Sequence, residues 1–154
     1  MTNSIRNCIL IHYDEIAVKL GNRSWFEKQL VKNIRNQISD FPFSNIKNFS
    51  ARIFINDIDI TKSNQYISKL RSVMGISSIH IMRHIISKIP DIKKVSLELL
   101  ELEKDNFQTF KIYTKRQNKK FLKTSQEVNA IIGEVICTKL NKKVNLKNPD
   151  LELR

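Results

Sequence analysis

The sequence predicts an α+β fold in two small units, residues 1–84 and 85–154. A length of 154 residues allows one or two small domains. A hydrophobic content of 41%, with only three glycines and three prolines, is typical of a folded chain rich in regular elements. Short apolar runs alternate with stretches of helical periodicity from one end to the other, which indicates mixed helix and sheet.

The first half predicts the order β-α-β-β-α-β, which is typical of a ferredoxin-like sandwich. The first helix is expected to open near Asn22 or Ser24, because Ser24 and Glu27 have the spacing of a capping box. The second is expected to run from an N-cap at Thr61 to a C-terminal glycine, Gly75. The expected buried stripe of the first helix is Phe26, Leu30, Ile34 and Ile38. The expected strands are residues 8–11, 51–55 and 78–82, with a weaker one around Ile46 and Phe49.

The second half predicts a helix capped by Asp91, a strand over 109–113 and a second helix with a capping box at Thr124 and Glu127. Two further strands are expected, one at Val144 and Leu146 and one at 151–153. The last strand has barely begun at Arg154. A sheet domain rarely ends in this way, so the expectation is an incomplete second domain in a fragment of a longer protein.

Basic residues outnumber acidic ones, and the formal net charge is +12. Each half carries +6, so the excess is not a detachable tail. Such a charge favours a polyanionic partner, nucleic acid before a membrane, because no stretch approaches the roughly 18 apolar residues of a spanning helix. Cys8 and Cys137 lie in apolar contexts, and the N-terminus lacks a signal-peptide pattern. We therefore expect a reduced, cytoplasmic location without a disulfide framework or a zinc site.

A catalytic interpretation finds little support. The sequence contains no glycine-rich phosphate loop. His80 and His84 would be spaced for a metal site on a helix, but their segment alternates as a strand, so no metal ligands are predicted. Asp14 and Glu15 are interpreted as a turn or an ion pair rather than an acid/base pair. Cys8 and Cys137 are interpreted as structural thiols, so no catalytic residue is predicted.

Two basic clusters favour binding. On the first helix, Lys28, Lys32 and Arg35 fall within about 80° of one another, roughly opposite the apolar stripe. The second cluster joins a strand to a capped helix and contains Lys115, Arg116, Asn118, Lys119, Lys120, Phe121 and Lys123. Cations beside a helix N-terminus suit phosphate. Phe121 either stacks on an unpaired base or fixes the loop to the core.

The segment from Ile11 to Glu27 resembles the opening signature of the tRNA 4-thiouridine synthetase family, in which Lys19, Asn22 and Arg23 match the motif. The second half resembles a THUMP domain, through Phe110-Lys111-Ile112, Lys115-Arg116, Lys120-Phe121, Thr124-Ser125-x-Glu127-Val128-Asn129, Gly133 and Val144-x-Leu146-x-Asn148-Pro149-Asp150. Asp14 and Leu20 replace two motif glycines, and Gly21 stands one place late.

The resemblance implies a ferredoxin-like domain followed by a THUMP domain, which together bind tRNA and present uridine 8 to a pyrophosphatase-type catalytic domain. The THUMP loop would take the 3′ CCA end. The acceptor stem would fall to residues of the first domain, namely Lys19, Asn22, Arg23, Lys28, Lys32 and Arg35. The resemblance implies ATP only in the catalytic domain and no cofactor in this chain, which alone is not expected to thiolate tRNA. A sulfur carrier or cysteine desulfurase would bind the full-length protein, which could also form a homodimer.

Other functions remain open at this point. The chain could be a stand-alone THUMP adaptor that presents tRNA to a separate modifying enzyme. It could instead be a basic structural or ribosome-assembly protein. An enzyme with a site built on His12, His80 and His84 is the alternative from a further class.

Overall fold

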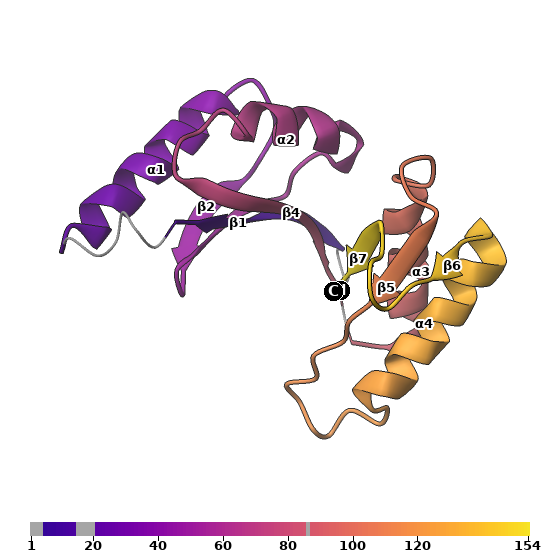
Figure 1. Cartoon of the computed structure of the whole chain (residues 1–154). Helices are drawn as coiled ribbons and strands as arrows, with labels where there is room; N and C mark the ends of the chain where they lie inside the picture. Colours follow the sequence, from indigo (N-terminus) through magenta and orange to yellow (C-terminus); the bar gives the residue numbers. More distant parts are fainter. Residues whose placement is uncertain (1–4, 15–20, 86) are drawn as a thin grey trace. The chain divides into compact units, whose positions relative to one another are not determined.

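The computed structural model describes residues 5–14, 21–85 and 87–154, so Glu15 and Lys19 lie outside the described part of the chain. The chain divides into two compact units, residues 1–84 and 85–154. Both units combine helices with a sheet, as Figure 1 shows, which confirms the α+β class.

The first unit has the predicted order β-α-β-β-α-β. Its elements are β1 (Arg6–Tyr13), α1 (Arg23–Gln37), β2 (Asn45–Phe49), β3 (Arg52–Asn56), the short 3-10 helix η2 (Ile60–Lys62), α2 (Ser63–Leu70) and β4 (Ile76–His84). The sheet order is β2-β3-β1-β4, with every neighbouring pair antiparallel. Both helices lie on one face of this sheet (Figure 1). This is the topology of a ferredoxin-like fold.

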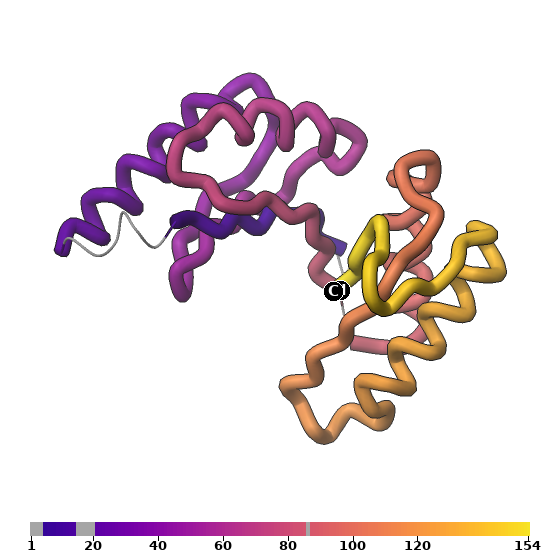
Figure 2. Tube along the Cα trace, in the orientation of Figure 1, coloured from indigo at the N-terminus to yellow at the C-terminus, as the bar shows by residue number. Residues whose placement is uncertain are grey.

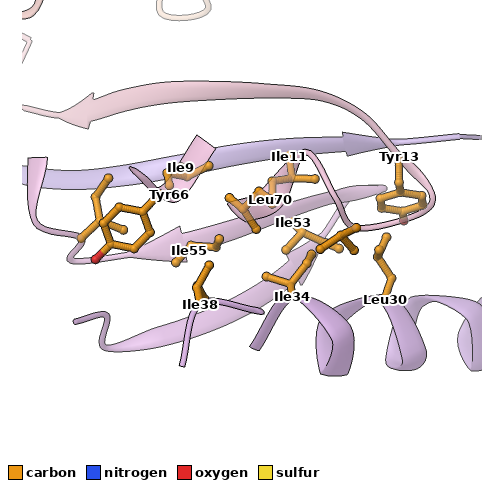
Figure 3. Close-up of a cluster of buried hydrophobic side chains, with 12 residues drawn as sticks. Ile9, Ile11, Tyr13, Leu30, Ile34, Ile38, Ile53, Ile55, Tyr66 and Leu70 are labelled. Carbon is orange, nitrogen blue, oxygen red and sulfur yellow. The ribbon is translucent and has the colours of Figure 1, made fainter. Parts of the chain in front are cut away.

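The core of the first unit lies between that sheet face and the two helices. Ile9 and Ile11, two residues apart on β1, point toward Leu30 and Ile34 of α1, as Figure 3 shows. All four side chains are buried. Tyr66 of α2 also enters this core and donates a hydrogen bond to the carbonyl of Pro42. The four-residue spacing of apolar residues therefore fixes which face of α1 is buried and which is left to solvent.

The second unit contains α3 (Ile89–Glu101), β5 (Thr109–Ile112), α4 (Ser125–Leu140), β6 (Lys143–Val144) and β7 (Leu151–Leu153). In its sheet β5 lies between β6 and β7 and runs parallel to both. The Asp150 carboxylate accepts the backbone N–H groups of Gln108 and Thr109 and so holds β7 against β5. These hydrogen bonds lower the pKa of Asp150 below its ordinary value.

One predicted capping box is confirmed and the other is wrong. At α4 the Thr124 hydroxyl accepts the Glu127 amide, and the Glu127 carboxylate accepts the Thr124 amide. At α1 the cap residue is Asn22, without a side-chain capping bond, and Ser24 lies inside the helix. The Glu27 carboxylate instead accepts hydrogen bonds from the Tyr13 hydroxyl and from Nε of Arg23, both at Oε1.

The predicted ends of α2 are also wrong. Thr61 lies inside η2, where the Asp59 carboxylate accepts its amide, and α2 begins only at Ser63. The helix ends at Leu70, so Gly75 is not its C-terminal cap. Gly75 instead has a φ of +94°, which favours glycine, at the turn that precedes β4.

Two expectations for the second unit need correction as well. Asp91 is not a cap, because α3 begins at Ile89 with Lys88 as its cap residue, and Asp91 lies in the first turn. Pro90 fits there because the first helical positions need no N–H partner within the helix. Leu146 is not part of a strand, since β6 ends at Val144.

Candidate nucleic-acid interface

The solvent-facing side of α1 carries the first basic cluster. Lys28, Lys32 and Arg35, here called the α1 row, are exposed, while Leu30 and Ile34 of the same helix are buried. Within residues 5–14, 21–85 and 87–154, no carboxylate forms an ion pair with the α1 row. The guanidinium of Arg35 lies 5.8 Å from the centre of the Phe43 ring, which restrains it without neutralising it. The row thus presents positive charge to solvent.

Arg23 belongs to a different part of α1. Its Nε donates to the Glu27 carboxylate at 2.7 Å, and the Tyr13 hydroxyl donates to the same oxygen. These hydrogen bonds, the one from Tyr13 foremost, lower the pKa of Glu27, while burial and Glu27 raise the pKa of Tyr13. Through Glu27, Arg23 therefore helps to hold the start of α1 to the end of β1, and this uses part of its hydrogen-bonding capacity. Asn22 is exposed at the cap position, and Lys19 lies outside the described residues.

The second cluster is the loop between β5 and α4, residues 114–123, here called the basic loop and coloured orange in Figure 2. Nη1 of Arg116 donates to the carbonyls of Phe121 and Lys123, at 3.3 and 3.2 Å. The side-chain oxygen of Asn118 accepts the Lys120 amide, and its backbone carbonyl accepts the Phe121 amide. Internal hydrogen bonds thus give the loop a definite shape, and they use part of the binding capacity of Arg116 and Asn118.

The remaining loop cations are directed to solvent. Lys115, Lys119, Lys120 and Lys123 are all exposed. Lys123 lies 3.9 Å from the Glu127 carboxylate, whereas the other three form no ion pair within the described part of the chain. Glu127 also occupies the amide end of α4 through the capping box, which lowers its own pKa. Anion binding at this loop therefore depends on the lysine side chains, since the capping carboxylate opposes an anion at the helix amides.

Three aromatic or aliphatic side chains belong to these two surfaces and differ in their exposure to solvent. Phe121 is half-buried against the second core, which fits the interpretation that it fixes the loop. Its neighbour Leu122 is 96% exposed, and Trp25 on α1 is 65% exposed. Sequence reasoning missed both, because a lone apolar residue next to an apolar stripe gives no signal that it faces solvent.

The histidines and cysteines do not form a reactive centre in the described residues. His12 and His80 pack edge to face at 5.5 Å, and His84 is exposed on β4. Groups of three or more metal-ligating side chains do not occur in the part of the chain that the structure describes. Cys8 is buried, which raises the pKa of its thiol and disfavours the reactive thiolate. Among the described residues, every helix falls short of the length and apolarity needed to cross a bilayer.

Comparisons with known families match both units. Residues 8–80 match the model described as the ThiI ferredoxin-like domain, and residues 87–154 match the model of the THUMP domain. Taken in this order, the two matches cover almost all of the chain, and they confirm the ferredoxin-like and THUMP assignments.

Relatives agree with these matches. The chain is 35% identical over 151 residues to a probable tRNA sulfurtransferase of Thermoanaerobacter pseudethanolicus, covering 97% of this chain and 38% of that protein. It is 36% identical over 148 residues to one of Clostridium kluyveri, covering 95% and 37%. The chain thus spans a little over a third of the length of these relatives.

Two solved structures are similar over both units. One is a 4-thiouridine synthetase in complex with RNA and ATP, with a TM-score of 0.73 and 28% identity over 98% of this chain and 39% of that one. The other is PH1313 from Pyrococcus horikoshii, with a TM-score of 0.72 and 27% identity over 95% and 49%. By its domains, its relatives and its fold, this chain belongs to the tRNA 4-thiouridine synthetase (tRNA sulfurtransferase) family, of which it contains the ferredoxin-like and THUMP domain region.

Proposed function

We propose that this chain is the tRNA-binding region of a tRNA 4-thiouridine synthetase. The observation that carries the proposal is the basic loop of the THUMP unit, with three exposed lysines that have no acidic partner among the described residues and a backbone fixed by Arg116 and Asn118. A preformed loop loses little conformational freedom on binding, so its cations are effective ligands for phosphate. The RNA in the similar synthetase complex supports the same kind of partner.

The two clusters divide the RNA between them. The basic loop binds the single-stranded 3′ CCA end, because an irregular loop can follow a backbone whose bases are unstacked. The α1 row is straight and about 10 Å long, which suits the phosphates of the regular acceptor stem. Asn22 and Arg23 at the start of α1, and Lys19 by its match to the family motif, supply further contacts to the acceptor stem.

Binding in this way holds the tRNA so that uridine 8 reaches a pyrophosphatase-type catalytic domain of the full-length enzyme. That domain supplies the ATP site, and this region needs no cofactor. A sulfur carrier or cysteine desulfurase, and a second copy in a homodimer, act on the full-length protein in the cytoplasm. The names of the relatives as tRNA sulfurtransferases, and the share of their length that the chain spans, support this assignment.

A binding titration tests the proposal. The chain is titrated with intact tRNA and with a blunt RNA duplex of equal charge at several salt concentrations. With six cations on phosphates, log affinity should fall against log salt with a slope of about −4 to −5. Intact tRNA should bind more tightly than the duplex at every salt concentration. Equal affinities for the two RNAs would remove the 3′ end from the interface.

A further inference from the structure

Trp25 is the least expected side chain on α1. It stands in the first turn of the helix and is 65% exposed, whereas the adjacent Phe26 packs against the core, 6.1 Å from the ring of Tyr13. A tryptophan that the fold needs is largely buried, since its ring is the largest apolar group a side chain can contribute. Phe26 fills the core at this point, so folding does not account for the indole at position 25.

The position of Trp25 on the helix connects it to the α1 row. At about 100° per residue, Trp25 falls within the same sector of about 80° that contains Lys28, Lys32 and Arg35. Lys28 is three residues away, so its side chain and the indole are neighbours on the helix surface. Arg23 and Glu27 lie on a different side of α1, where they bond to each other. An exposed aromatic plane thus stands at the end of a row of cations that lack acidic partners among the described residues.

An aromatic plane beside cations has a specific ligand chemistry. Regular duplex RNA offers phosphates to such a row, but its bases are stacked on each other and present no free face. An unpaired base does present one, and stacking on a tryptophan accepts any base. Because base and phosphate belong to one nucleotide, a base on Trp25 brings its phosphates within reach of Lys28 and Lys32. The exposed indole could also contact a partner protein, but the neighbouring cations favour a polyanionic ligand.

We propose that Trp25 and the α1 row form a stacking subsite of the ferredoxin-like unit for an unpaired base of an RNA, with the base on the indole and its phosphates on Lys28 and Lys32. The subsite rests on the proposed function, and it deepens it: the first unit holds an unpaired nucleotide in addition to duplex phosphates. The 3′ end is bound by the basic loop, so this nucleotide is a different one.

Trp25 is the only tryptophan of the chain, so its fluorescence reports on this position alone. The full chain is titrated with a ten-residue oligouridylate and, separately, with inorganic polyphosphate of similar charge. Stacking predicts that the oligouridylate quenches Trp25 and that polyphosphate does not. Trp25→Ala should weaken oligouridylate binding about 5- to 100-fold, followed by anisotropy of a labelled oligonucleotide. Trp25→Phe keeps a flat ring and should retain most of the affinity.

Phe49→Ala is the matched control, because Phe49 is an exposed aromatic of the same unit, 71% exposed on β2 and outside α1. It should leave oligouridylate binding unchanged, and unchanged thermal melting of each variant excludes unfolding. The inference is overturned if Trp25→Ala binds oligouridylate as tightly as the unsubstituted chain does. It is also overturned if this substitution weakens the binding of polyphosphate by the same factor as the binding of oligouridylate. If tRNA still binds in either case, the proposed function survives the loss of this subsite. If neither tRNA nor oligouridylate binds the chain, both proposals fail.

Discussion

Neutralising the exposed lysines of the basic loop should remove a defined part of the salt dependence of RNA binding. The perturbation is the triple variant Lys115→Ala, Lys119→Ala and Lys120→Ala. None of these side chains forms an ion pair within the described residues, and the loop is held by other groups, namely the Arg116 guanidinium, the Asn118 side chain and backbone atoms. The substitutions therefore remove charge while leaving the hydrogen bonds of the loop in place.

The magnitude follows from counterion release. Each phosphate neutralised on a single strand contributes a slope of about 0.7 to the dependence of log affinity on log salt. Three lysines on three phosphates thus account for a slope of about 2. If affinity at 1 M salt is unchanged, the triple variant should bind intact tRNA about 100-fold more weakly at 0.1 M salt.

The assay is fluorescence anisotropy with end-labelled tRNA between about 0.05 and 0.5 M salt. The matched control is a second triple variant of the same unit, Lys93→Ala, Lys94→Ala and Lys104→Ala, whose lysines are exposed outside the loop. The control loses the same charge and should change the slope by much less. Equal slopes for the two triple variants would refute the reasoning, because net charge alone would then explain binding.

The remaining predictions concern the fold that presents these surfaces. Gly75→Ala should lower the free energy of unfolding by about 1–3 kcal/mol in denaturant titrations, because its φ is +94° and a Cβ there would lie 2.9 Å from Cζ of Phe26. Phe121→Ala should lower the free energy of unfolding without RNA by about 1–2 kcal/mol. This is less than the roughly 3–5 kcal/mol lost when a fully buried phenylalanine is replaced by alanine. An unchanged melting temperature would contradict the packing role of Phe121. The hydrogen bond from Tyr13 lowers the pKa of Glu27 below 4.5, so the stability it contributes is present above that pH and is lost as pH falls through the lowered pKa. Tyr13→Phe should therefore lose less stability than the unsubstituted chain as the pH falls from above the ordinary glutamate pKa through the lowered pKa of Glu27, and an equal loss would contradict this role of the hydrogen bond.

The spacing of apolar residues predicted the helices and strands well, because burial against the core determines that spacing. The residues at four-residue spacing on α1, such as Leu30 and Ile34, pack against alternating residues of β1, so both patterns are visible in the sequence. The burial of Tyr66 is not visible in the sequence, since the group that its hydroxyl bonds to, the Pro42 carbonyl, is distant along the chain.

Helix caps were less predictable because several residues compete for one role. Thr124 caps α4 as its spacing predicts, whereas Glu27 has the same spacing from Ser24 but is engaged by Tyr13, which is distant in sequence. The basic clusters were visible as charge patterns. The sequence does not reveal that Arg116 bonds within its own loop or that Trp25 is exposed, because both depend on the path of the folded backbone.

The central claim is that the basic loop recognises the 3′ end of tRNA, and one comparison tests it most directly. Intact tRNA and tRNA trimmed of its 3′ single strand are titrated against three proteins: the unsubstituted chain, the loop triple variant, and an α1-row variant with Lys28, Lys32 and Arg35 replaced by alanine. The account predicts that the unsubstituted chain prefers intact tRNA, that the loop variant loses this preference, and that the row variant weakens both RNAs by the same factor. If the loop variant weakens intact and trimmed tRNA by the same factor, the loop does not recognise the 3′ end and the account is contradicted.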